Sequence, residues 1–145
     1  MKILGLASDH AGFAMKCLIK EHLLHKGFNI IDYGCDSDAS CDYPDYAHKL
    51  GQSIDNEDVD LGFVFCGSGN GISMTINKHP NVRAAICWNP TIASLARHHN
   101  NANVCSLPAR FINNNEALEI VDIFLSEDFD GGRHLVRIDK IPIYS

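Results

Sequence analysis

The chain has 145 residues, of which 46% are hydrophobic and 21% are charged, as in an ordinary globular protein and unlike a disordered one. Its formal net charge of −6 argues against non-specific binding to nucleic acid or to an anionic membrane surface. No apolar run approaches the roughly 20 residues of a membrane helix, and the first residues lack a secretory signal, so we expect a cytoplasmic protein.

Six cysteines are scattered along the chain, and no two of them form a CxxC pair. Their density is far below that of small disulfide-stabilised secreted proteins. We therefore expect free thiols in a reducing compartment, without a disulfide framework or a zinc site.

The first half of the chain alternates between apolar and amphipathic segments. Residues 2–7 are predicted to form a strand, and residues 12–26 a helix that stops at Gly27. A second strand over 28–33 and a polar loop lead to a helix that begins at Pro44 and ends near residue 54. The clearest buried strand covers residues 60–66.

The second half continues the alternation after a glycine-rich turn. The predicted helices cover 72–78, 90–98 and 113–125, and the predicted strands cover 83–87 and 104–107. Residues 132–140 are predicted to form a last helix. This order of elements predicts an α/β fold with a five-stranded parallel sheet and helices on both faces. With no linker or repeat, we expect one domain over 1–145, whose segment from about 128 to 145 reaches a partner subunit.

The glycine-rich turn after the third strand begins at Cys66. Its glycines allow a tight bend, so that backbone N–H groups and the start of the next helix form an anion site. A thiol beside such amides becomes available as a thiolate and can act as a general base. The turn matches neither a Walker A loop nor a dinucleotide fingerprint. An ordinary tight turn with a buried, inert cysteine is the alternative.

Three further groups of polar residues stand at the ends of predicted elements. Asp9 and His10 follow the first strand, where Asp9 either caps a helix or, with His10, contacts a ligand. His98 and His99 end a helix, where adjacent histidines point in different directions and make a poor metal pair. Arg133 and Arg137 are four residues apart, so on a helix they share a face and can hold one phosphate, unless they form a solvated basic patch.

Taken together, these residues resemble the ribose-5-phosphate isomerase type B family over essentially the whole chain. The motifs that carry the resemblance are Asp9-His10-Ala11-Gly12-Phe13, Asp42-Tyr43-Pro44-Asp45-Tyr46-Ala47, Cys66-Gly67-Ser68-Gly69-Asn70-Gly71-Ile72-Ser73, Asn77-Lys78, Arg97-His98-His99-Asn100-Asn101-Ala102-Asn103 and Gly131-Gly132-Arg133-His134. They occur in the family's order and with matching separations.

The resemblance implies a Rossmann-like three-layer α/β/α fold and a homodimer, or a dimer of dimers, with active sites at the subunit interface. It implies an aldose–ketose isomerase of the pentose phosphate pathway, which interconverts ribose 5-phosphate and ribulose 5-phosphate without metal or cofactor. Cys66 would be the base, Ser68 its assistant and His99 the acid/base that opens the furanose ring. The implied substrate-binding residues are Asp9, His10, Tyr43, Gly67, Gly69, Asn70, Gly71, Asn100, Arg110, Arg133 and Arg137.

One choice between family variants, one departure from the family pattern and three alternatives remain. One family variant carries a glutamate base just after the loop, where this chain has Ile72, so Cys66 is preferred as the base. Ser68 stands where some relatives have threonine, and His98 has no assigned role and is expected to be a surface residue. The alternatives are a galactose-6-phosphate isomerase, an allose-6-phosphate isomerase, and a sugar-phosphate sensor without catalysis.

Overall fold

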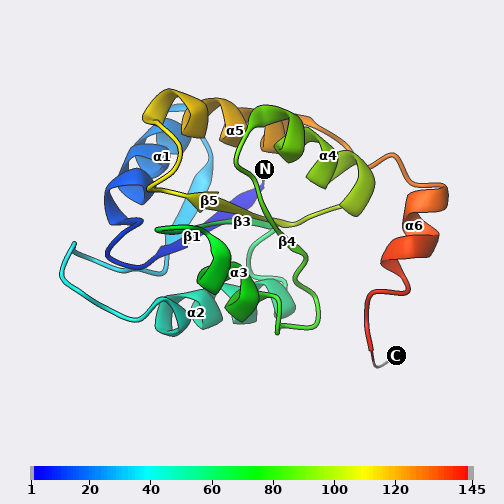
Figure 1. The fold of residues 1–145 in the computed structure, drawn as a ribbon, viewed down its shortest axis with the longest axis horizontal. Helices are drawn as coiled ribbons and strands as arrows, with labels where there is room; N and C mark the ends of the chain where they lie inside the picture. The colour runs from blue at the N-terminus through cyan, green and yellow to red at the C-terminus, as the bar shows by residue number, and fades with distance from the viewer. Residues whose placement is uncertain (1, 144–145) are drawn as a thin grey trace.

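The computed structural model describes residues 2–143 and shows a five-stranded parallel sheet with strand order β2-β1-β3-β5-β4. Its strands are β1 (Ile3–Ser8), β2 (Asn29–Asp32), β3 (Leu61–Cys66), β4 (Ala84–Ile86) and β5 (Val104–Pro108). The helices are α1 (Phe13–His25), α2 (Tyr43–Asp55), α3 (Asn70–Ile76), α4 (Pro90–Asn100), α5 (Asn114–Ser126) and α6 (Arg133–Ile138). Helices α1, α4 and α5 cover one face of the sheet, and α2 and α3 cover the other (Figure 1). The predicted Rossmann-like α/β/α fold is confirmed.

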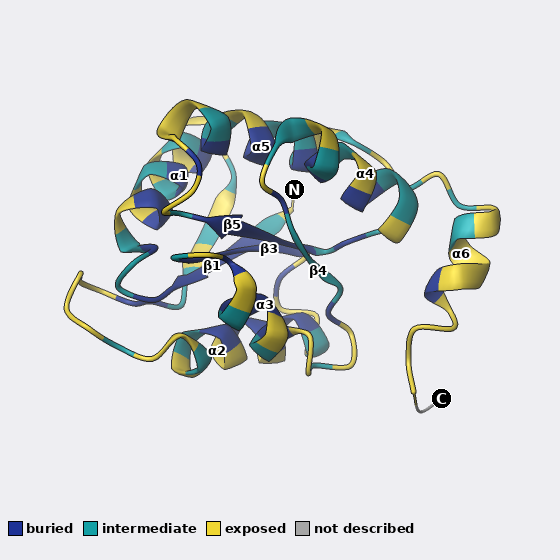
Figure 2. Ribbon diagram, viewed as in Figure 1, coloured by how far each residue is buried: buried dark blue, intermediate teal, exposed yellow. Residues whose placement is uncertain are grey.

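The C-terminal segment stands apart from these layers. Helix α6 lies beside the end of α4 and projects from the body of the molecule (Figure 1). Much of its surface is exposed (Figure 2). Residues 144–145, the end of the segment predicted to reach a partner, lie outside the described residues. The described helices include none that is long and apolar enough to span a membrane.

The predicted elements all form, but α4 ends two residues later than predicted, α6 ends two residues earlier, and α3 is shifted by two residues at both ends. The helix begins at Asn70 because Gly69 takes a left-handed conformation, with φ of 79°, and starts the helical turn at once. It ends at Ile76 because the side chain of Asn77 binds the backbone of Ala84 at both its N–H and its C=O. Asn77 therefore joins the end of α3 to the edge strand β4.

Capping residues explain why α4 and α5 begin where the sequence predicts. The Asn89 side chain accepts a hydrogen bond from the amide of Ile92 at 2.8 Å, and Pro90 occupies the first turn. Asn113 and Glu116 form a reciprocal capping box at the start of α5. These contacts satisfy amide donors that the first turn of a helix leaves free.

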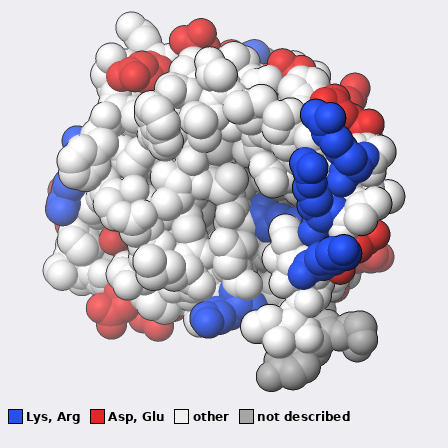
Figure 3. Space-filling view, turned by 45° about the vertical axis from the view of Figure 1, so that its right-hand side comes forward, with Lys and Arg blue, Asp and Glu red and all other residues white. Residues whose placement is uncertain are grey.

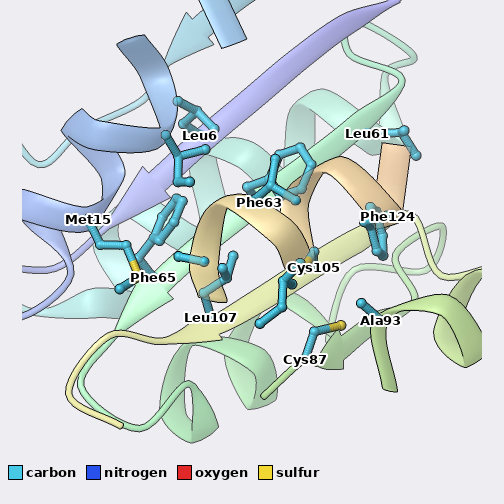
Figure 4. Packing of buried hydrophobic residues seen from close by; sticks show 14 of the residues in the cluster. Leu6, Met15, Leu61, Phe63, Phe65, Cys87, Ala93, Cys105, Leu107 and Phe124 are labelled. Carbon is cyan, nitrogen blue, oxygen red and sulfur yellow. The ribbon is translucent and has the colours of Figure 1, made fainter. Parts of the chain in front are cut away.

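The hydrophobic core lies on both faces of the central strands. Strands β3 and β5 are buried along their whole length (Figure 2). Phe63 from β3 meets Phe124 from α5 edge to face, with ring centroids 5.6 Å apart, and Leu107 packs in the same layer (Figure 4). A rigid sheet thus fixes the strand ends from which the loops with polar residues emerge.

A buried ion pair joins α1 to β2. The ammonium of Lys16, a residue only 1% exposed, donates to Asp32 at 2.7 Å and to the carbonyl oxygen of Cys35 at 2.8 Å. Burial alone would raise the pKa of Asp32, but hydrogen bonds from Lys16 and from the Gly34 amide outweigh burial and lower it. The carboxylate therefore stabilises the fold above the ordinary carboxyl pKa of about 3.9, and this contribution is lost as the pH falls through the lower folded value.

We expect Asp32→Ala to lower the free energy of unfolding by about 3–5 kcal/mol, because it leaves the Lys16 ammonium buried without its counter-charge. Urea denaturation at neutral pH measures this loss. The control is Asp122→Ala, which removes a more exposed partner of His22 and Lys26 and should cost no more than about 1 kcal/mol. Equal losses in the two variants would contradict the prediction.

Candidate active site

Two neighbouring strands bring Asp9 and Cys66 to the same point of the sheet. Strand β1 pairs with β3 so that Ser8 lies opposite Phe65, and the amide of Asp9 donates to the Phe65 carbonyl at 3.2 Å. A pocket of about 390 Å³ opens here, at the carboxyl edge of the sheet, where α/β proteins bind ligands. Its lining residues are Asp9, Tyr43, Cys66, Gly67, Ser68, Gly71, Arg110 and Phe111.

The glycine-rich loop folds over the thiol of Cys66, which is buried at 5% exposure. The amide of Gly69 donates to Cys66 Sγ at 3.1 Å, and the amide of Asn70 donates to Ser68 Oγ at 3.2 Å. This amide places a hydrogen-bond donor at the sulfur that the sequence predicts to be the base. The predicted base and its predicted anion-binding loop therefore form one unit.

Two buried serines, to which no sequence pattern assigned a role, hold this loop in place. Ser73 and Ser106 both donate to the carbonyl oxygen of Gly69, at 2.6 and 2.9 Å. Because the Gly69 carbonyl is held from two sides, the turn at Gly69 is fixed, and the N–H of the same residue stays directed at Cys66. Ser106 could have been noticed in the sequence because it is a polar residue within an otherwise apolar predicted strand.

Two glycines of the loop leave room for side chains of other elements to lie against the loop and line the pocket. A Cβ at Gly71 would lie 2.6 Å from the hydroxyl of Tyr43, and one at Gly67 would lie 3.2 Å from Nη1 of Arg110. Tyr43 and Arg110 therefore close against the loop from α2 and from the end of β5. Phe111, which follows Arg110 in the sequence and had no predicted role, adds an apolar side chain to the rim and is 76% exposed.

Asp9 and His10 each make a hydrogen bond to the backbone and also line a pocket. The Asp9 carboxylate accepts from the Gly12 amide at 3.1 Å and so holds the turn before α1, whose N-cap residue is Gly12 and not Asp9. His10 Nδ1 accepts from the amide of Cys41 at 3.2 Å, which leaves Nε2 as the hydrogen-bond donor. A second pocket of about 530 Å³ contains His10 and shares Asp9 and Tyr43 with the first, so the two pockets adjoin.

The remaining predicted residues, on α4 and α6, lie toward the amino ends of the strands, opposite to the pocket at their carboxyl ends. Helix α4 runs back across the sheet and delivers His99 and Asn100 just before β5 begins, whereas Cys66 pairs with Pro108 at the end of β5. Five strand residues span roughly 13 Å, at about 3.3 Å for each step. One chain therefore does not bring His99, Asn100, Arg133 and Arg137 to Cys66.

His99 belongs to a second cluster, with Asp130 and His134. The His99 and His134 rings are stacked, with centroids 4.3 Å apart and planes within 11° of each other. Burial, the nearby His99 and the two arginines of α6 lower the pKa of His134, so its neutral form prevails at neutral pH.

This cluster does not suit a metal ion, although one ligand atom from each of its three residues lies within 4.8 Å of the others. A metal lies in the plane of each imidazole that binds it, and two parallel stacked rings share no such plane. Asp130 is also already hydrogen-bonded to His98. The neutral His134 ring and the two arginines suit proton exchange and anion binding instead.

The chain resembles known proteins along nearly its whole length. A family model described as Ribose/Galactose Isomerase matches residues 4–141. A probable ribose-5-phosphate isomerase B of Mycoplasma genitalium is 47% identical over 141 residues, which are 96% of this chain and 93% of the relative.

Two solved structures agree with that likeness. The ribose 5-phosphate isomerase from Thermotoga maritima superposes with a TM-score of 0.95 at 49% identity, covering 97% of both chains. The Mycoplasma genitalium structure, with bound ribulose-5-phosphate, gives a TM-score of 0.91 at 46% identity and covers 96% of this chain and 93% of the other.

Proposed function

The chain belongs to the ribose/galactose isomerase family, and we infer that it is an aldose–ketose isomerase that interconverts ribose 5-phosphate and ribulose 5-phosphate. The observation that carries the chemical assignment is the position of the Cys66 thiol. It lies in a pocket, and its sulfur accepts a hydrogen bond from the Gly69 amide at 3.1 Å. A sensor would need the loop and the arginines but no thiol held beside the loop amides inside the pocket. The relatives named for ribose-5-phosphate isomerase support the five-carbon substrate over galactose 6-phosphate and allose 6-phosphate.

In the proposed reaction, Cys66 shuttles a proton between two carbons. Its thiolate takes the proton from carbon 2 of the open-chain aldose, and the electron pair moves to the carbonyl oxygen on carbon 1 to give an enediolate. Amides of the loop from Gly67 to Gly71 stabilise this anion, and Ser68 assists the exchange of the oxygen protons. The thiol then returns its proton to carbon 1, and the carbonyl forms at carbon 2.

We propose a homodimer, or a dimer of dimers, in which each active site uses both chains. Cys66, Asp9 and Tyr43 of one chain would face His99, Asn100 and the arginines of the other, which explains why one chain leaves them at opposite edges of the sheet. Exposed apolar side chains, such as Trp88 at 55% and Val136 at 58%, provide surface to bury.

The charge distribution supports the same arrangement. Lysine and arginine side chains gather on the side of the molecule that carries the C-terminal segment (Figure 3). Arg133 and Arg137 extend from α6 in that region and are exposed, as donors to a phosphate on another chain need to be. His10 and Arg110 would complete the phosphate and sugar contacts. All six cysteines are free, which fits the proposed cytoplasmic location.

The test is formation of ribulose 5-phosphate from ribose 5-phosphate by protein treated with a chelator. Allose 6-phosphate and galactose 6-phosphate are assayed beside it at equal concentration. Turnover of ribose 5-phosphate at the highest kcat/KM supports the proposal. Faster turnover of a six-carbon substrate would replace the assignment, and binding without turnover would indicate a sensor.

We expect Arg137→Ala to raise the KM for ribose 5-phosphate by about tenfold to a hundredfold with little change in kcat. The reason is that the arginine holds the phosphate equally in the ground state and in the transition state. Steady-state kinetics measure both constants. An effect confined to kcat would contradict a role in phosphate binding.

A further inference from the structure

The segment that carries α6 is attached to the end of α4 around one residue, His98. His98 Nε2 lies 2.9 Å from a carboxylate oxygen of Glu127, and His98 Nδ1 lies 2.9 Å from one of Asp130. The backbone repeats the attachment, because the amide of Asp130 donates to the His98 carbonyl at 3.0 Å. Three contacts thus join one helix end to the four residues that precede the turn into α6.

The geometry indicates the charge that His98 carries. A carboxylate only accepts hydrogen bonds, so Nδ1 of His98 donates to Asp130, while Nε2 lies at ion-pair distance from Glu127. The doubly protonated imidazole, with a proton on each nitrogen and a positive charge, suits both carboxylates. The hydrogen bond to Asp130 raises the pKa of His98 above its ordinary value of 6.5, with Glu127 adding to this effect and burial opposing it.

The surroundings link this point to the proposed phosphate-binding residues. Arg97, the preceding residue of α4, directs Nε at the carbonyl of Glu127 at 3.4 Å. His99, the next residue, stacks on His134 of α6. Gly131 and Gly132 both have positive φ, at 71° and 59°, and a Cβ at either would meet nothing within 4 Å. Neither glycine is packed in place, so the position of α6 depends on the contacts at His98 and His99 together with the burial of Ile138 on α6 itself.

We propose that His98 is a positioning residue for the isomerase reaction. As a cation it fastens residues 127–130 to α4, and it thereby holds Arg133 and Arg137 of α6 where they bind the substrate phosphate. The link to substrate rests on the proposed function, whereas the fastening itself does not.

The direction of the pH dependence follows from the raised pKa. The charged groups that meet His98 are Glu127 and Asp130 on the facing segment, and Arg97 and His99 flank it on α4. The fastening is complete below pH 6.5 and weakens as the pH rises through the higher folded value. The KM for ribose 5-phosphate is therefore expected to rise over that range in the unmodified protein.

The experiment compares two variants at His98 with one control. His98→Gln removes the cation and one of the two donors, and His98→Arg keeps a cation with several donors. His22→Gln is the control, because His22 also pairs with a carboxylate, Asp122, but on the contact between α1 and α5. Hydrogen exchange at the amides of 128–138 and steady-state kinetics between pH 6 and pH 9 are measured for each protein.

We expect His98→Gln to accelerate exchange across 128–138 and to raise the KM by about threefold to tenfold, with kcat within about twofold. The pH-dependent rise in KM should be lost in this variant and partly restored in His98→Arg, while His22→Gln behaves as the unmodified protein does. Unchanged exchange, or faster exchange without an effect on KM, would overturn the proposal. If the unmodified protein lacks isomerase activity, the proposed function fails; exchange and calorimetric binding of ribose 5-phosphate then still decide the role of His98.

Discussion

Replacing Cys66 with alanine is expected to lower kcat for ribose 5-phosphate by about 10²- to 10⁴-fold, the contribution of a positioned general base. Binding should change little, because Cys66 is 5% exposed and the phosphate contacts come from other residues. The loop should keep its shape, since Ser73 and Ser106 hold the Gly69 carbonyl without help from the thiol. Steady-state kinetics measure the loss in kcat, and calorimetry measures the retained affinity.

The chain offers a matched control in Cys17, an exposed free thiol on α1, far from the loop. Cys17→Ala should leave kcat and KM unchanged. Alkylation by iodoacetamide provides a second readout: it should inactivate the unmodified protein, and ribulose 5-phosphate should protect it by filling the pocket. Full activity in Cys66→Ala would show that Cys66 is not the base. An equal loss of activity in Cys17→Ala would show that loss of any cysteine impairs the protein.

The layers of the fold were predictable from the sequence because each element has its own local signal. The apolar run of β3 and the capping residues at Asn89 and Asn113 act within a few residues of the elements that they define. The start of α3 was predicted two residues late because the left-handed turn at Gly69 follows from the sheet and the Cys66 contact, not from the helix sequence.

The site was predictable in part, for a physical reason. Residues that follow parallel strands meet at one edge, so Asp9 and the loop at Cys66 could be placed together from the order of elements. Ser73 and Ser106 converge on one carbonyl from a helix and a strand, a contact that no spacing along the chain reveals. The partners of His98 were missed in the same way, and the residue expected to be without a role has two carboxylate partners.

The second large effect concerns the proposed sharing of the active site between two chains. We expect a heterodimer of one Cys66→Ala chain and one His99→Asn chain to recover about half the activity of the unmodified dimer, because one of its two sites receives an intact Cys66 and an intact His99. Each variant homodimer should be nearly inactive on cyclic ribose 5-phosphate, since every site lacks one of the two groups. Co-expression with two different affinity tags, followed by sequential purification, isolates the mixed dimer for assay.

The position of His99 across the sheet makes this outcome specific to a shared site. If Cys66 and His99 of the same chain worked together, both sites of the mixed dimer would keep one defect and the activity would stay at background. A heterodimer of His99→Asn with Arg137→Ala is the matched control, because both residues lie at the same edge and each site then loses one of them. Both mixtures are assayed at ribose 5-phosphate well below the KM, where the Arg137→Ala defect also lowers turnover. Recovery in the first mixture and none in the second is then the pattern that two copies, each completing the other's pocket, require.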